Sequence, residues 1–370
     1  MSAFARTDRS LLGQWWWTVD RFFLVGIGIL VLIGAIMVLA SSPPIARNLR
    51  LDGMHFVIRH FIVLVPAGLC LFAVSLLAPR GVLRLATVIF AVSAVLTAAT
   101  LFFAPEIKGA TRWLFIAGQQ LQPSEFLKPG LAVVVAWLLA SKPGLKGLPL
   151  SLLLVGGSIA ILLLQPDLGM AAVVAAFFAA QLFVAGLGWL PIILLAGVGL
   201  GGLWGAYTFL GHVRERIDGF LDPTAEIYQV ERALSAVKSG GFFGRGPGEG
   251  VVKFRLPEAH SDFVFATVAE EFGIIACLVI VAIFAFLVLR ALWRLQLNPN
   301  RFVQLAATGL VAQFGLQALV NMAVNVNLVP TKGMTLPFIS YGGSSLLAIA
   351  ITMGMLLALT RRGARLEPIP

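Results

Sequence analysis

The sequence predicts an all-α polytopic membrane protein with about ten transmembrane helices and one large extracytoplasmic loop that carries an amphipathic helix. Its 370 residues are 59% hydrophobic and 12% charged, and the mean hydropathy is +0.94. Soluble domains average about 25% charged residues. A chain of this length holds roughly ten spans of about 20 residues each. We therefore expect residues 1–370 to form a single integral membrane domain.

Ten apolar runs follow one another along the chain. They cover about residues 22–40, 57–78, 82–103, 125–140, 149–164, 168–187, 190–210, 264–289, 302–324 and 341–360. The tryptophan cluster Trp15–Trp17 precedes the first run and is typical of a membrane interface. The first run is long enough for an uncleaved anchor. Cys70 and Cys277 lie inside apolar runs and predict neither a disulfide nor a metal site.

Basic residues indicate how the chain crosses the membrane. An even number of spans puts both termini on one side, and that side collects most of the Lys and Arg residues beside the runs. By the positive-inside rule, residues 1–21 and 361–370 are predicted to be cytoplasmic tails and residues 211–262 a large periplasmic loop. The net charge of +10 is dispersed among loops, which fits topology and an anionic partner better than nucleic acid.

The large loop contains two recognisable segments. Thr224–Lys238 spaces apolar residues three and four apart and is followed by Gly240 and Gly241, so it predicts an amphipathic helix resting on the bilayer surface. The segment Gly244–Gly250 reads GRGPGEG. It lacks the spacing of a phosphate-binding loop, and we interpret it as a flexible connector.

Polar residues also gather at the outer ends of the runs. Glu125 and Lys128 share one helix face, where they either order the helix entry as a salt bridge or face a polar cavity. Asp167, beside the helix break at Pro166, either caps the next helix or lines a cavity. The glycines, hydroxyls and asparagines of 325–345 would admit a polar ligand or pack helices closely.

The most charged boundary is Pro257–Gly273, which reads PEAHSDFVFATVAEEFG. Ionisable residues at such a depth indicate function. Consecutive helical residues diverge by about 100°, so at most one of Glu270 and Glu271 can face a cavity; the alternative is a buried carboxyl bonded to a neighbouring helix. His260 could contact a phosphate or carry a proton, or simply pack. Together with the preceding segments, this stretch predicts a site at the outer face.

Five segments carry a resemblance to a known family: GATRW, QPSEFLK, QPDLG, PEAHSDFVFATVAEEFG and LVPTKGMTLPFISYGGSS. In their order and spacing they resemble the signature loops of the SEDS family (shape, elongation, division and sporulation) of bacterial cell-wall polymerases. The likeness extends over nearly the whole chain. Within the family, PEAHSDF, TKGMTLP and YGGSS are more similar to division members than to elongation members. Ser261 departs from the common threonine.

The resemblance implies a glycosyltransferase that polymerises lipid II into peptidoglycan at the outer face of the inner membrane, at the division septum. It also implies a cognate class B penicillin-binding protein, an FtsI-like transpeptidase, as partner, together with other divisome membrane proteins. The family's essential acid falls on Asp262. Joining two lipid-linked sugars with inversion needs a base for the acceptor hydroxyl, and a carboxylate suits that role.

The remaining candidate residues are expected to support Asp262 or bind substrate. They are Arg112, Glu125, Lys128, Asp167, His260, Lys332, Ser340, Gly342 and Gly343. In the simplest hypothesis, Lys128 holds Asp262 in orientation and Glu125 balances Lys128. The departing pyrophosphate needs cations aimed at its charge. No organic cofactor and no protein metal site are expected, although a divalent cation, Mg²⁺ or Mn²⁺, could bridge the pyrophosphate.

Two other functions fit the same composition. A lipid II flippase would also have about ten spans and buried charges, but only one strong helix break is evident, at Pro166. A non-catalytic scaffold for the septal transpeptidase would not depend on Asp262. The concentration of acids and bases on one face favours a reaction over transport.

Overall fold

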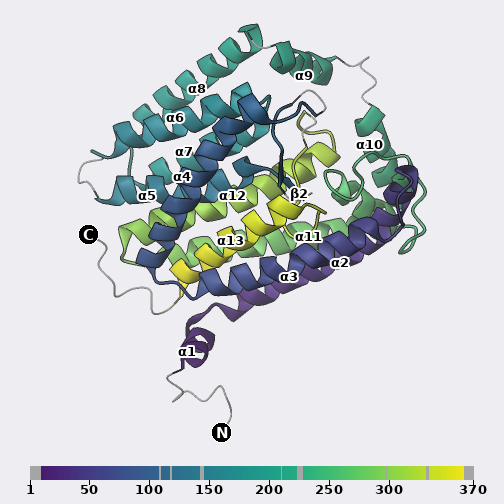
Figure 1. Ribbon diagram of the computed structural model, residues 1–370, viewed down its shortest axis with the longest axis horizontal. Coiled ribbons are helices and arrows are strands. Elements are labelled where there is room, and N and C mark those ends of the chain that lie inside the picture. Colours follow the sequence, from purple (N-terminus) through teal and green to yellow (C-terminus); the bar gives the residue numbers. More distant parts are fainter. Residues whose placement is uncertain are drawn as a thin grey trace.

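The computed structural model describes residues 10–107, 110–116, 119–141, 146–209, 211–222, 228–296, 298–330 and 333–361. The regular elements of this part of the chain are helices apart from one small hairpin (Figure 1). The elements are α1 (Leu11–Thr18), α2 (Arg21–Asn48), α3 (His55–Ser75), α4 (Pro79–Phe103), β1 (Leu114–Ile116), β2 (Gln119–Leu121), α5 (Pro123–Ser141), α6 (Leu148–Leu164), α7 (Leu168–Val184), α8 (Trp189–Phe209), α9 (Gly211–Leu221), α10 (Tyr228–Gly240), a 3-10 turn η2 (Val252–Phe254), α11 (Val264–Gln296), α12 (Arg301–Asn325) and α13 (Gly343–Thr360).

Each of the ten predicted apolar runs is a helix. Within the described ranges, eight helices are long and apolar enough to cross a membrane. The other two, α6 and α7, have 17 residues each. At 1.5 Å per residue, 17 residues extend about 25 Å, somewhat less than the roughly 30 Å of hydrocarbon in a bilayer.

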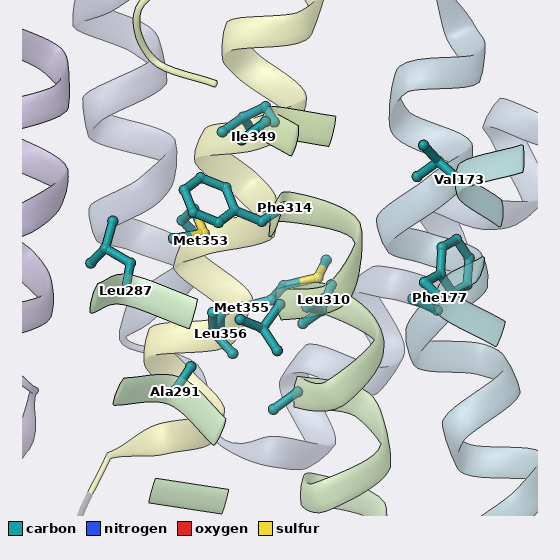
Figure 2. Packing of buried hydrophobic residues seen from close by; sticks show 14 of the residues in the cluster. Val173, Phe177, Leu287, Ala291, Leu310, Phe314, Ile349, Met353, Met355 and Leu356 are labelled. Atoms are coloured by element: carbon teal, nitrogen blue, oxygen red, sulfur yellow. The ribbon is translucent and has the colours of Figure 1, made fainter. Parts of the chain in front are cut away.

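The core lies between α5, α12 and α13, which are the most buried of the long helices. α12 packs against α5, α7 and α11, and α13 packs along α3. Figure 2 shows part of this core, with Phe177 from α7, Leu287 from α11, Phe314 from α12 and Met353 from α13. The helices that carry these side chains need no polar face, because each helix has apolar surroundings on every side.

α8 is the opposite case. Only Ala206 is buried along its 21 residues, and its recorded neighbours are α7 and α9, which adjoin it in the chain. The exposed side chains are large and apolar, among them Trp189, Leu194 and Trp204. A helix that is apolar all round and not covered by protein is suited to lipid contact.

A short antiparallel hairpin lies between α4 and α5, where the sequence predicted only a loop. β1 pairs with β2 so that Leu114 lies opposite Leu121 and Ile116 opposite Gln119. β2 lies against α13. The hairpin therefore brings the segment containing Arg112 back toward the bundle just before α5 begins.

α10 is the amphipathic helix predicted within Thr224–Lys238, and it ends at Gly240 as expected. Val230, Ala233 and Ala236 are buried. A Cβ at position 240 would lie 1.8 Å from the carbonyl oxygen of Ala269 in α11, so the two helices touch directly. Protein covers part of the face expected to rest on the bilayer surface, because Val230 is buried while Leu234 and Val237 are half-buried.

Asp20 joins α2 and α11 at the end of the bundle where α1 and the last turn of α13 lie (Figure 1). Its Oδ1 accepts hydrogen bonds from the N–H groups of Phe22 and Phe23 and so caps α2. Its Oδ2 lies 2.7 Å from Arg290 Nε and 2.6 Å from Arg294 Nε. Arg294 also donates to the Thr360 carbonyl at the end of α13. One buried carboxylate thus connects three helices.

We predict that Asp20→Asn destabilises the protein by about 3 kcal/mol, because removing one partner of a buried ion pair leaves the other charge uncompensated. Asparagine still caps a helix, so the loss reports on the ion pairs. The measurement is thermal unfolding in detergent, with the exposed Asp52→Asn as control. Equal midpoints for the two variants would show that the ion pairs contribute nothing.

Candidate functional site

Asp262 lies two residues before α11, where the large loop returns to the bundle. Its side chain is half-buried between the buried Ser261 and Phe263. The main-chain carbonyl of Asp262 accepts hydrogen bonds from Asn321 Nδ2 and Asn325 Nδ2, each at 2.9 Å. The backbone at Asp262 is therefore fixed to α12, while the residue itself stays half-buried.

Gly333 lies directly against the Asp262 carboxylate. A Cβ at position 333 would be 2.7 Å from Asp262 Oδ2. The loop 333–342 is also bonded to the main chain before Asp262: Ser340 Oγ donates to the Ser261 carbonyl, and the Tyr341 N–H donates to the His260 carbonyl. Ser340, predicted as a support residue, thus positions the chain beside Asp262.

A ladder of amides on α12 supports this arrangement. Gln317, Asn321 and Asn325 are spaced four apart, so they lie on one face of the helix. Asn321 bonds the Met334 carbonyl as well as that of Asp262, and Asn325 Oδ1 accepts from the Ala266 N–H at 2.9 Å. The ladder therefore ties α12 to both loops that meet at Asp262.

Lys128 and Glu125 form a buried pair on α5. Lys128 is fully buried, and its Nζ lies 2.8 Å from Glu125 Oε2 at an angle outside hydrogen-bond geometry. Lys128 Nζ also donates to Gln317 Oε1 at 2.9 Å, and Gln317 Nε2 reaches the main-chain and side-chain oxygens of Thr335. The salt-bridge interpretation is confirmed. Among the described contacts, Lys128 bonds Gln317 of α12, the helix that binds the Asp262 carbonyl, and does not contact Asp262 itself.

Arg112 and Asp167 hold the break between α6 and α7. Asp167 Oδ1 accepts from the Met170 N–H at 3.1 Å and caps α7. Arg112 Nη1 lies 3.6 Å from Asp167 Oδ2, and Arg112 donates to the carbonyls of Gln165 and Pro166. The capping interpretation of Asp167 is confirmed, and Arg112 is engaged in closing this turn.

His260 is buried in an aromatic cluster. The centroids of the Phe56 and Tyr341 rings each lie 4.9 Å from its ring, and Nδ1 has no hydrogen-bond partner. Burial lowers the pKa of His260 to about 4, because the charged imidazolium loses its hydration. His260 is therefore neutral at pH 7 and offers no positive charge to a phosphate.

The glycine-rich segment is fixed to α11, so its interpretation as a flexible connector is wrong. Glu270 accepts hydrogen bonds from the N–H groups of Val251, Val252 and Lys253. Glu271 pairs with Lys253 Nζ and accepts from the Gly248 N–H. Both carboxyls are buried. The Glu271 carboxyl binds this segment and the Glu270 carboxyl binds the three residues after it, instead of the neighbouring helix that the sequence suggested.

The last candidates lie around the start of α13. Gly342 precedes the helix, and a Cβ there would be 3.1 Å from Thr335 Cγ2. Gly343 is the first helical residue. Lys332 lies outside the described residues. In the ranges that are described, no three His, Cys, Asp or Glu side chains gather as possible metal ligands.

Sequence reasoning missed two hydrogen-bonded residues of this site, Gln317 and Asn321. A signal was present, because Gln313, Gln317, Asn321 and Asn325 recur every four residues in an otherwise apolar run. Polar residues inside a membrane segment face the bundle interior and pair there. The spacing could have identified α12 as the support of the site, although it could not identify the carbonyls it binds.

Known relatives match the chain over most of its length. The family model described as "Cell cycle protein", which covers FtsW, RodA and SpoVE, matches residues 20–364. A protein of Caulobacter vibrioides named "Probable peptidoglycan glycosyltransferase FtsW" is 44% identical over 365 residues, covering 97% of this chain and 94% of that protein. A Halomonas elongata protein with the same name is 36% identical over 367 residues, covering 94% and 92%.

Two solved structures share the fold. A chain from a study of how a peptidoglycan synthase complex coordinates polymerization and crosslinking has a TM-score of 0.78 at 27% identity, covering 94% of this chain and 99% of that one. The Rod shape determining protein RodA of Thermus thermophilus has a TM-score of 0.71 at 26% identity, covering 95% and 99%. The chain belongs to the SEDS family of FtsW, RodA and SpoVE, and it is FtsW-like.

Proposed function

We propose that this protein is a peptidoglycan glycosyltransferase that polymerises lipid II during septal cell-wall synthesis, with Asp262 as general base. The observation that carries the proposal is the clamping of the Asp262 backbone by Asn321 and Asn325 while its carboxylate stays half-buried beside Gly333. A fixed backbone under an accessible carboxylate is what a positioned base requires. The names of the relatives support the same activity.

In the proposed reaction, the acceptor sugar hydroxyl attacks the anomeric carbon of the donor. Its proton passes to the Asp262 carboxylate as the new glycosidic bond forms. The bond from the anomeric carbon to the pyrophosphate oxygen breaks on the opposite face, and undecaprenyl pyrophosphate leaves with inversion. The Gly333 backbone gives the substrate room next to Asp262, since any side chain there would meet the carboxylate.

The cations for the pyrophosphate need a separate assignment. Arg112, Lys128 and Lys253 each contact a carboxylate within the protein, so their charge is already partly compensated. Arg245 and Arg255 are exposed on the loop that leads to Asp262. We propose that these two arginines approach the leaving group. No three carboxylate, imidazole or thiol groups gather among the described residues, so a Mg²⁺ or Mn²⁺ ion would have to enter with the pyrophosphate, whose negative charge it would offset. No organic cofactor enters the proposal.

The proposed setting is the bacterial inner membrane at the division septum, with both termini cytoplasmic and Asp262 on the periplasmic side. The positive-inside distribution of Lys and Arg supports this orientation. The proposed partner is a class B penicillin-binding protein of the FtsI type, with other divisome membrane proteins nearby. The likeness to a chain from a peptidoglycan synthase complex supports a synthase partner.

We predict that Asp262→Asn lowers the rate of glycan-strand formation from purified lipid II by about 10²- to 10⁴-fold, the usual contribution of a general base. The assay uses the protein with its transpeptidase partner in detergent, where translocation across a bilayer has no meaning. Asp52→Asn, the same change at an exposed position, serves as control and should retain full activity. Undiminished polymerisation by folded Asp262→Asn protein would remove Asp262 from the mechanism.

We also predict that Asn325→Ala lowers kcat by about 10- to 100-fold, because a base displaced by about 1 Å loses near-attack geometry. The variant loses the bonds to the Asp262 carbonyl and the Ala266 N–H. Gln304→Ala removes a side-chain hydrogen bond near the start of the same helix and should leave kcat unchanged. A similar kcat for both variants, with folding verified by thermal unfolding, would show that the amide ladder does not position the base.

A further inference from the structure

The loop after α10 ends in two phenylalanines that no protein group covers. Phe242 is 70% exposed and Phe243 is 84% exposed. They stand between Gly241 and Gly244, both with positive φ. Large apolar side chains exposed together at a loop tip usually mark an interaction surface. The function proposed above gives these two residues no role.

The tip has a rigid base. Two glycines allow backbone to approach backbone: a Cβ at Gly244 would lie 2.1 Å from the Glu271 carbonyl oxygen, and a Cβ at Gly273 would lie 2.2 Å from that of Phe242. The Ile274 N–H donates to the Gly241 carbonyl at 2.9 Å, and the Arg245 N–H donates to that of Glu270 at 2.9 Å. The tip therefore cannot move independently of α11.

The tip is hydrogen-bonded to α11 at the point where that helix passes from buried to exposed residues. Residues 264–271 are all buried in protein, whereas Ile274, Ile275 and Leu278 are exposed and apolar. The backbone breaks between these parts at Gly273, with φ 80° and ψ 178°. The uncharged part of this helix, 274–289, extends about 24 Å at 1.5 Å per residue, most of the roughly 30 Å of hydrocarbon in a bilayer. Gly273 therefore lies near one edge of the hydrocarbon layer.

We propose that Phe242 and Phe243 insert into the lipid bilayer at this edge and fix the height of the segment that carries Asp262. Their apolar surface continues the lipid-facing side of α11. The exposed Lys238 precedes the tip and complements anionic lipid headgroups. The same loop continues through Lys253, which Glu270 and Glu271 bind to α11. A tip inserted in the bilayer would therefore keep the segment that leads to Asp262 at a fixed depth.

The first test measures depth directly and does not depend on activity. A nitroxide label is attached at Phe243→Cys, in a chain carrying Cys70→Ala and Cys277→Ala, and the protein is placed in vesicles of phosphatidylethanolamine and phosphatidylglycerol. We expect oxygen, which concentrates in the bilayer, to enhance the relaxation of the nitroxide more than a water-soluble nickel complex does. A label at Glu249→Cys, exposed on the same loop, should show the reverse. A Phe243 label as accessible to nickel as the Glu249 label would overturn the proposal, as would protection seen only when the transpeptidase partner is added.

The second test concerns the role of the tip in catalysis and rests on the proposed function. The double variant Phe242→Ser, Phe243→Ser should polymerise lipid II at the wild-type rate in detergent and at least fivefold more slowly in vesicles. An equal rate ratio in both media would show that insertion does not position the site. Loss of all activity from the wild type would instead count against the proposed function and leave the depth measurement unaffected.

Discussion

The buried ammonium of Lys128 is the constraint on which the centre of the protein depends. An ammonium group in a membrane interior has no water to solvate it, so protein groups must supply its partners. Glu125 and Gln317 do so, and Gln317 in turn bonds Thr335. The requirement to satisfy one cation thereby sets the relative positions of α5, α12 and the loop that lies against Asp262.

The same principle operates at the start of α11, where main-chain N–H groups and the Lys253 ammonium are the partners of two buried carboxylates. Glu270 takes three successive N–H donors and Glu271 takes Lys253. A loop rich in glycine has little conformational preference of its own, so these carboxylates supply the order that its sequence lacks. Glu270 and Glu271 have the carboxyl groups expected of catalytic residues, but both are buried and serve the structure. Asp262, in contrast, is half-buried.

The length of the apolar runs was enough to predict the ten long apolar helices, because lipid-facing and core-facing helices are both apolar over a span's length. Helical spacing alone predicted the Glu125–Lys128 pair. The contacts between distant segments were not predictable: the apolar face of α10 could have met lipid or protein, and only packing on Ala269 decides between them. The partners of Glu270 were missed for a similar reason, since backbone donors in a loop leave no mark in residue type.

The 17-residue lengths of α6 and α7 have a consequence for the surrounding membrane. Helices about 5 Å too short for the hydrocarbon layer create hydrophobic mismatch, which a bilayer relieves by thinning. The turn that joins these helices carries Asp167, paired with Arg112, so the thinned patch would bring headgroups and water down to that ion pair. The bilayer surface on the side of this turn would then be dimpled beside the protein, so that a lipid-linked sugar there sits deeper than in the surrounding leaflet.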